Sequence, residues 1–187
     1  MSYKPNKNGD LEDCLALMVM SAENLVFEIE KQINKKNYEI GAILLRSLLE
    51  INANIKYIYA SSSKTLPTRF LKTAELTSKN LFALKNKEKP LNVSWAKKSI
   101  VQRVSALGED ELAMYKFLSS YAHSDAGFMA GYSLGYRKKL GPVFLAVTAD
   151  YLWDIIDNLS EFGVIRKKDL EKQIYRTMKH RLPELKR

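Results

Sequence analysis

The chain contains few of the residues that mark several common classes of protein. Its 187 residues include one cysteine, two histidines, eight glycines and five prolines. A single cysteine, Cys14, excludes an internal disulfide, which is typical of proteins in a reducing cytoplasm. So few turn-forming residues argue against a β-sandwich and against a disordered chain.

Long apolar runs are also missing. No stretch approaches the roughly 18–20 apolar residues that span a bilayer. The first residues, MSYKPNKNGDLED, lack the apolar core of a signal peptide. A hydrophobic fraction of 46% is nevertheless enough for a substantial core. We therefore expect one cytoplasmic domain over residues 1–187, with a flexible N-terminus at 1–10 and no association with membranes.

The spacing of apolar residues predicts helices throughout, and no alternating segment is long enough for a core strand. The fold class is therefore all-α, a compact up-and-down bundle of about six to seven helices. The helix over 38–60 is apolar almost all round and should be the central, most buried element. Cys14 lies in the apolar pattern of the first helix and should be a buried structural thiol. The predicted helices are 11–35, 38–60, one from Pro67 to about 84, 95–107 capped by Ser94, one from Asp110, 143–162 and 168–181.

A glycine-rich segment separates the fifth and sixth predicted helices. It has glycine at positions 127, 131, 135 and 141. This density of glycine predicts a mobile surface loop or a short hairpin. Tyr132 and Tyr136 within it can stack on a base or close over a ligand, although a plain connector is the alternative.

Two sets of polar residues recur at helical spacing among apolar neighbours. Arg46 and Glu50 are four residues apart on one helix, and Tyr115, Ser119 and His123 follow the same spacing on another. Charges in an apolar helix are costly unless they are paired, so we expect a salt bridge and a buried polar network. Such a network can bind a phosphate and exchange protons. It can equally serve only to fix the packing of the helices.

The familiar motifs of catalysis and cofactor binding are absent. There is no phosphate-binding loop and no dinucleotide-binding glycine pattern. Two histidines and one cysteine far apart in the sequence do not make a usual zinc site. Ser119 and His123 resemble half of a hydrolase dyad, but there is no nucleophile elbow. We therefore expect no cofactor and no metal.

The formal charge is +9 and the isoelectric point is near 9.5. A basic chain favours polyanionic partners, nucleic acid foremost, although solubility alone also explains such a charge. Lysine and arginine dominate from 64 to 103 and again from 166 to 187, and 164–187 should form a basic C-terminal helix. Spacings of four, four and three place four cations on one side of that helix as a basic ridge that can contact phosphates. The basic ridge consists of Lys168, Lys172, Arg176 and Lys179.

Several of these segments together resemble an uncharacterised bacterial all-helical domain family. They are LLRSLLEINANIKYIYA, Trp95 ahead of a helix, and YKFLSSYAHSD, with the patterns R-x-x-x-E and Y-x-x-x-S-x-x-x-H. The resemblance covers roughly residues 15 to 160. More distantly, the chain is similar to HEPN helical domains of toxins, anti-phage systems and RNA-processing proteins. That similarity implies a HEPN-like bundle, a homodimer and metal-independent ribonuclease activity.

The catalytic pattern of HEPN domains has an arginine separated by four to six residues from a histidine on one helix. No arginine precedes His123 in that window, and Arg176 is only four positions before His180. In a nuclease, Arg46 would therefore have to act from another helix.

Two functions are compatible with these patterns. The first is a helical module that binds RNA, another nucleic acid or a protein partner, in a bacterial defence or toxin-type system. The second is a metal-independent endoribonuclease. In it, His123 would be the general acid or base, Arg46 would hold the phosphate and Glu50 would fix the geometry, while Tyr115 and Ser119 would support the histidine. The sequence alone does not decide whether the chain is an enzyme.

Overall fold

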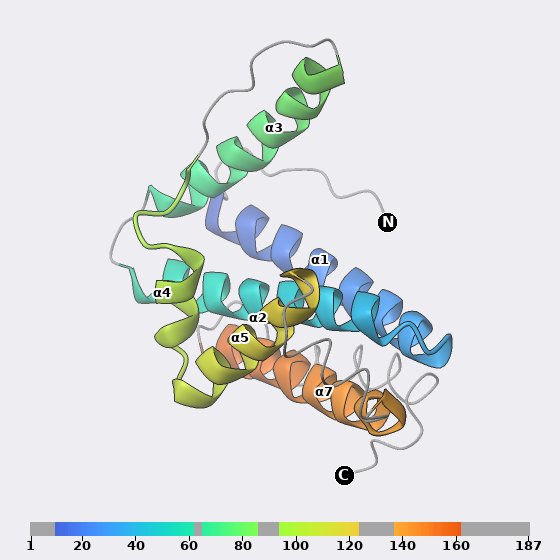
Figure 1. Ribbon diagram of the computed structural model, residues 1–187. Helices are drawn as coiled ribbons and strands as arrows, with labels where there is room; N and C mark the ends of the chain where they lie inside the picture. Colours follow the sequence, from blue (N-terminus) through green and yellow to red (C-terminus); the bar gives the residue numbers. More distant parts are fainter. Residues whose placement is uncertain (1–9, 62–64, 86–93, 124–136, 162–187) are drawn as a thin grey trace.

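The computed structural model describes residues 10–61, 65–85, 94–123 and 137–161 (Figure 1). Within these ranges, the description of side chains leaves out positions 10, 77–85, 122–123 and 137–139. The described residues form helices and no strand, which confirms the all-α class. The helices are α1 (Asp10–Asn34), α2 (Tyr38–Ala60), α3 (Leu66–Lys85), α4 (Ile100–Ser105), α5 (Glu109–His123) and α7 (Arg137–Glu161).

Helix α2 is the centre of the bundle. It packs against α1, α4, α5 and α7, while α3 contacts α1 and extends away from the other helices (Figure 1). The buried side of α2 includes Leu45, Leu48 and Leu49, which have no exposed surface. Burial of such side chains stabilises the fold by about 1.5–3 kcal/mol each. The opposite side is open, since Ile40 and Ile43 are 47% and 41% exposed. The predicted central position of this helix is therefore confirmed, but its burial is not complete.

The turn between α1 and α2 ends the first helix without a glycine. Lys36 adopts a left-handed conformation with φ of 61°. Its backbone N–H donates to the carbonyl of Ile33 at 2.8 Å, and that of Asn37 donates to Gln32 at 2.9 Å. These two bonds are the pattern of a Schellman C-cap, which satisfies carbonyls at the end of α1. The turn sets α2 beside α1, and Cys14 of α1 is fully buried, as predicted for a structural thiol.

The prediction of one helix over 95–107 is wrong. Helix α4 begins only at Ile100, because Ser99 and Gln102 form a capping box that starts the helix there. Ser94 instead donates its hydroxyl to the carbonyl of Ala96 at 3.1 Å. Trp95 lies outside the helix, and its ring packs edge-on against Phe70 at 5.1 Å. The tryptophan is therefore used for packing before α4 rather than as part of a helix.

The last described helix begins earlier than predicted. Helix α7 starts at Arg137 and contains both Gly141 and Pro142, which were expected to lie in a loop before 143. Pro142 is the sixth residue of α7 and therefore lies beyond the first turn, so it costs this helix one backbone hydrogen bond. Gly141 allows a close approach, since a Cβ atom there would lie 3.1 Å from Cε1 of Tyr38 and 3.4 Å from Cγ2 of Ile33. The start of α7 is thus fitted against the corner between α1 and α2.

Replacement of Gly141 by valine is expected to lower the free energy of unfolding by about 1–3 kcal/mol, because the added Cβ atom and its two methyl groups overpack this corner. Thermal or denaturant unfolding measures the change. Ala146→Val is the matched control, since Ala146 is exposed on the same helix and should be nearly neutral. Equal effects of the two substitutions would show that the corner has room for a larger side chain.

Other predictions concern residues outside the described ranges. They are the flexible start at 1–10 except Asp10, the part of the loop from Gly127 to Tyr136 that includes Tyr132, and the basic C-terminal helix with its basic ridge. Among the described helices, none is long and apolar enough to cross a membrane.

Candidate functional site

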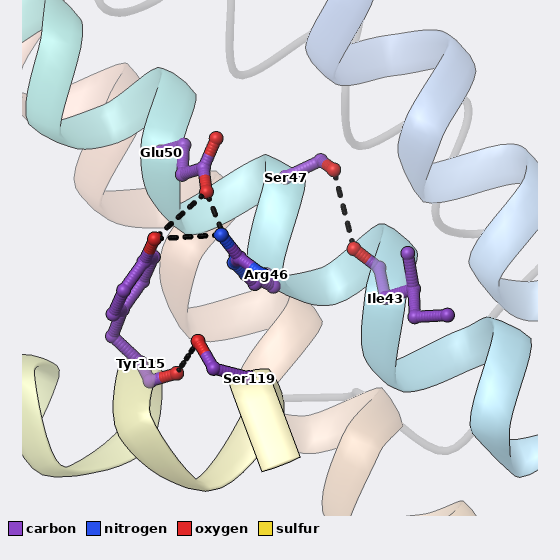
Figure 2. Close-up of polar contacts among 6 residues, drawn as sticks. All are labelled: Ile43, Arg46, Ser47, Glu50, Tyr115 and Ser119. Atoms are coloured by element: carbon purple, nitrogen blue, oxygen red, sulfur yellow. Dashed lines mark hydrogen bonds and ion pairs between the residues drawn. The ribbon is translucent and has the colours of Figure 1, made fainter. Parts of the chain in front are cut away.

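The candidate site begins with two charged side chains on α2. Arg46 and Glu50 are one helical turn apart, and Nε of Arg46 donates to Oε1 of Glu50 at 3.1 Å (Figure 2). The predicted salt bridge is therefore present. Ser47, the next residue on the helix, directs its hydroxyl away from this pair to the carbonyl of Ile43.

Tyr115 of α5 joins this pair from the facing helix. Nη2 of Arg46 donates to the Tyr115 hydroxyl at 2.8 Å, and that hydroxyl donates to Oε1 of Glu50 at 3.2 Å (Figure 2). The guanidinium also lies 4.8 Å from the centre of the tyrosine ring. Each of the three side chains therefore contacts the other two. We refer to them as the Arg46–Glu50–Tyr115 cluster, which fixes α5 against α2.

The cluster is only partly buried, and the expectation of a fully buried network is wrong. The side chains of Arg46 and Glu50 keep 24% and 31% of their surface exposed, whereas Tyr115 keeps 5%. The reason is that α5 lies beside the charged edge of α2 and leaves the neighbouring Ile43 open to solvent. A solute can therefore reach the guanidinium and the carboxylate.

Burial raises the pKa of the Tyr115 hydroxyl, and the negative charge of Glu50 raises it further, while the hydrogen bond from Arg46 acts in the opposite direction. The phenol consequently stays protonated at neutral pH. The hydroxyl therefore donates a hydrogen bond to Glu50 and accepts one from Arg46, and it does not act as a base.

Ser119 and His123 follow Tyr115 on α5. The Ser119 hydroxyl donates to the backbone carbonyl of Tyr115 at 2.7 Å (Figure 2), so its proton is directed to its own helix. His123 is the last residue of α5, and its side chain lies outside the described residues. Eight residues of helix separate its backbone from that of Tyr115 by about 12 Å along the axis. The predicted contact between His123 and Arg46 stays a prediction.

Sequence reasoning missed Arg103, which lies beside the cluster. Its guanidinium stacks on Trp95 at 4.9 Å and on Tyr57 at 5.8 Å, and Nη1 donates to the carbonyl of Lys98 at 2.6 Å. Burial lowers the pKa of Arg103, while Tyr57 and Glu50 raise it, so the guanidinium remains charged. A second cation therefore acts on Glu50 in addition to Arg46. No spacing rule could identify it, because α4 meets α2 only through the fold.

The polar edge of α2 continues beyond Glu50. Asn54 is one turn further on, as its spacing predicts, and its Oδ1 atom is buried. Neither this atom nor Nε of Arg103, which is also buried, has a hydrogen-bond partner among the described residues. Chemically, the edge offers two guanidiniums, one carboxylate and one phenol, which suits binding of an anion or orientation of a phosphate. Within the described part of the chain, no three metal-binding side chains come together.

The substitution Glu50→Ala is expected to lower the free energy of unfolding by about 1–2 kcal/mol, since it removes a partly solvated ion pair and a charged hydrogen bond. If the pair were fully buried, removal of Glu50 would instead lower the free energy of unfolding by about 3–5 kcal/mol. The thermal unfolding midpoint measures the change. Glu28→Ala is a control that breaks the exposed Glu28–Lys31 pair on α1 and should move the midpoint less. Equal shifts would mean that the bond from Tyr115 adds no stability.

A comparison with known proteins finds no matching family model, no matching curated protein and no matching solved structure. What the site does must therefore be argued from its own chemistry.

Proposed function

We propose that the chain is a helical RNA-binding module whose basic C-terminal segment provides the contacts to phosphates. The observation that supports this proposal is the distribution of charge. The described residues contain equal numbers of acidic and basic side chains, so the formal excess of +9 lies entirely in the other segments. Most of it lies in 162–187. Positive charge that serves only solubility can be spread over the whole surface. A surface that binds a polyanion needs its positive charge in one place, as in this segment.

The basic ridge is the part of this segment to which we assign the contacts with RNA. Its four cations are spaced to lie on one side of a helix. A ridge of this kind contacts the backbone rather than the bases, so the binding should depend little on sequence. The partly exposed cluster at α2 and α5 then offers a separate, more specific place for one phosphate.

The experiment is a titration of the full chain with a labelled single-stranded RNA at several salt concentrations. About four phosphate contacts predict a slope of log affinity against log salt of roughly −3. A single-stranded DNA of the same sequence is the comparison, because a contact to phosphate alone treats both alike. No binding at low salt would reject this function and would assign the charge to an acidic protein partner or to solubility.

A second candidate function is metal-independent cleavage of RNA. The observation that favours it is the bond from Nη2 of Arg46 to Tyr115, which holds a guanidinium against the helix that ends at His123. In this reaction, His123 takes the proton of a 2′-hydroxyl, and the 2′-oxygen attacks phosphorus to form the cyclic phosphate. The bond from phosphorus to the 5′-oxygen breaks, the 5′-oxygen takes a proton from water, and His123 then releases its own proton to solvent. Arg46 neutralises the phosphate, and Glu50 holds Arg46 in place.

This second function has its own test. RNA is incubated with the full chain in excess chelator, beside a DNA of the same sequence that has no 2′-hydroxyl. Cleavage of RNA alone, leaving a cyclic 2′,3′-phosphate end, is the expected result. RNA that stays intact rejects the nuclease and leaves the binding function untouched.

The biological setting is part of the same proposal. We place the chain in a bacterial defence or toxin-type system, as a cytoplasmic homodimer with a HEPN-like arrangement of helices. The all-helical architecture of the described residues supports the HEPN-like arrangement alone. Measurement of the molar mass in solution tests the dimer.

A further inference from the structure

The outer face of α7 carries four acidic residues in one line. Their spacings of four, three and four residues place them on the side of the helix opposite its buried residues. All four are exposed. This acidic face of α7 consists of Asp150, Asp154, Asp157 and Glu161.

The middle of this face is crowded with negative charge. Burial raises the pKa of Asp154, and the charges of Glu111, Asp150 and Asp157 raise it further, whereas Lys56 lowers it. Glu111 comes from α5, so two helices contribute to the crowding. Like charges at this spacing repel each other, and added cations on the face would relieve the repulsion.

The segment that follows α7 in the sequence has the matching pattern with the opposite sign. The basic ridge has spacings of four, four and three, and it begins seven residues after Glu161. If a helix over 168–179 turns back along α7, one antiparallel register brings every acid of the face opposite a base of the ridge. The pairs in that register are Glu161 with Lys168, Asp157 with Lys172, Asp154 with Arg176, and Asp150 with Lys179.

We propose that residues 168–179 of the same chain dock on the acidic face of α7 in this register. The charges are complementary along the full length of the face. The connection between Glu161 and Lys168 is short, as in an antiparallel pair of helices joined by a tight loop. The occupant is therefore part of this chain and not a separate basic protein.

Docking has a consequence that rests on the RNA-binding function proposed above. The ridge that pairs with α7 is the ridge that contacts phosphates, so RNA and the acidic face compete for the same cations. Exposed ion pairs are individually weak and are screened by salt, which makes the docked state reversible. RNA of sufficient length replaces the acidic face as the partner of the ridge. Short or weakly bound RNA does not, so docking lowers the affinity of the chain for such ligands.

Crosslinking of the full chain tests the docking without RNA. The in-register pair Asp157→Cys/Lys172→Cys is treated with a short bis-maleimide, beside the out-of-register pair Asp150→Cys/Lys172→Cys. The native Cys14 is fully buried and contributes little background. The two pairs differ by about 10 Å along the helix. We expect the first to crosslink within one chain at least tenfold faster.

Two outcomes overturn the proposal. Equal rates for the two pairs show that the register does not exist. Crosslinks that join two chains show that the occupant of the face is a second copy.

A second measurement separates docking from the RNA-binding function. Asp154→Asn/Asp157→Asn should raise the affinity for single-stranded RNA about threefold or more by freeing the ridge. Glu12→Gln/Glu23→Gln removes the same charge from exposed positions on α1 and should raise it less. Equal gains assign the effect to net charge and overturn the competition. In-register crosslinking in a chain that binds no RNA supports docking and rejects the RNA-binding function alone.

Discussion

The double substitution Lys172→Ala/Arg176→Ala is expected to weaken binding of single-stranded RNA about tenfold and to change its salt dependence, since two of about four phosphate contacts are lost. Each contact on a single strand contributes about 0.7 to the slope, so the slope should change from roughly −3 to roughly −1.5. A titration at several salt concentrations measures both quantities. The change in slope is the more specific result, because it counts released counterions.

A matched control removes the same charge from another part of the chain. Lys97 and Lys98 are exposed in the segment before α4, and Lys97→Ala/Lys98→Ala should leave the slope nearly unchanged. If both double variants change the slope equally, RNA responds to net charge and not to the basic ridge. If neither does, the contacts to phosphate lie elsewhere.

The helices whose position depends on local pattern could be predicted from the sequence. Helix α2 has the bounds that its apolar spacing predicts, because Asn37 and Ser61 lie in polar segments that interrupt the pattern on both sides. Its central place also follows from composition, since a helix with so many apolar residues must bury most of its surface. These are properties of a single segment and need no knowledge of its neighbours.

The errors concern places where tertiary contacts override local preference. Gly141 and Pro142 are ordinary signals of a loop, yet α7 continues through them, and Gly141 leaves the space that this helix needs beside Tyr38. Trp95 looks like the start of a helix, but its ring contacts Tyr57 and Phe70 from an irregular segment. In both cases the deciding partner lies far away in the sequence.

The candidate site shows the same division. The spacing of Arg46 and Glu50 predicts their salt bridge, and the need to satisfy charge predicts a partner such as Tyr115. The degree of exposure could not be predicted, because it depends on where α5 crosses the edge of α2. Arg103 could not be found either, since its position depends on the aromatic rings that hold it.

The largest effect on activity is expected from His123→Ala, if the chain cleaves RNA. Loss of the general acid or base should lower the rate of cleavage by about 10²–10⁴-fold. Arg46→Ala removes a charge that stabilises the transition state and should cost about 10²–10³-fold. Tyr115→Phe keeps the ring and removes only the hydroxyl, so it tests whether Arg46 must be held by the cluster. Rates under single-turnover conditions with chelator present measure all three effects.

The second histidine of the chain is the matched control. His180→Ala should leave cleavage unchanged, because the proposed chemistry uses only the histidine at the end of α5. The structure gives His123 and Arg46 different helices, so a substrate must lie between α5 and α2 to contact both. If the two residues act as one unit, the losses of rate caused by their substitution do not add. The double variant Arg46→Ala/His123→Ala should then cleave RNA about as slowly as His123→Ala alone. If the rate falls in the double variant by the product of the two single effects, the two residues serve different steps. If His180→Ala alone abolishes cleavage, the catalytic site lies in the C-terminal segment.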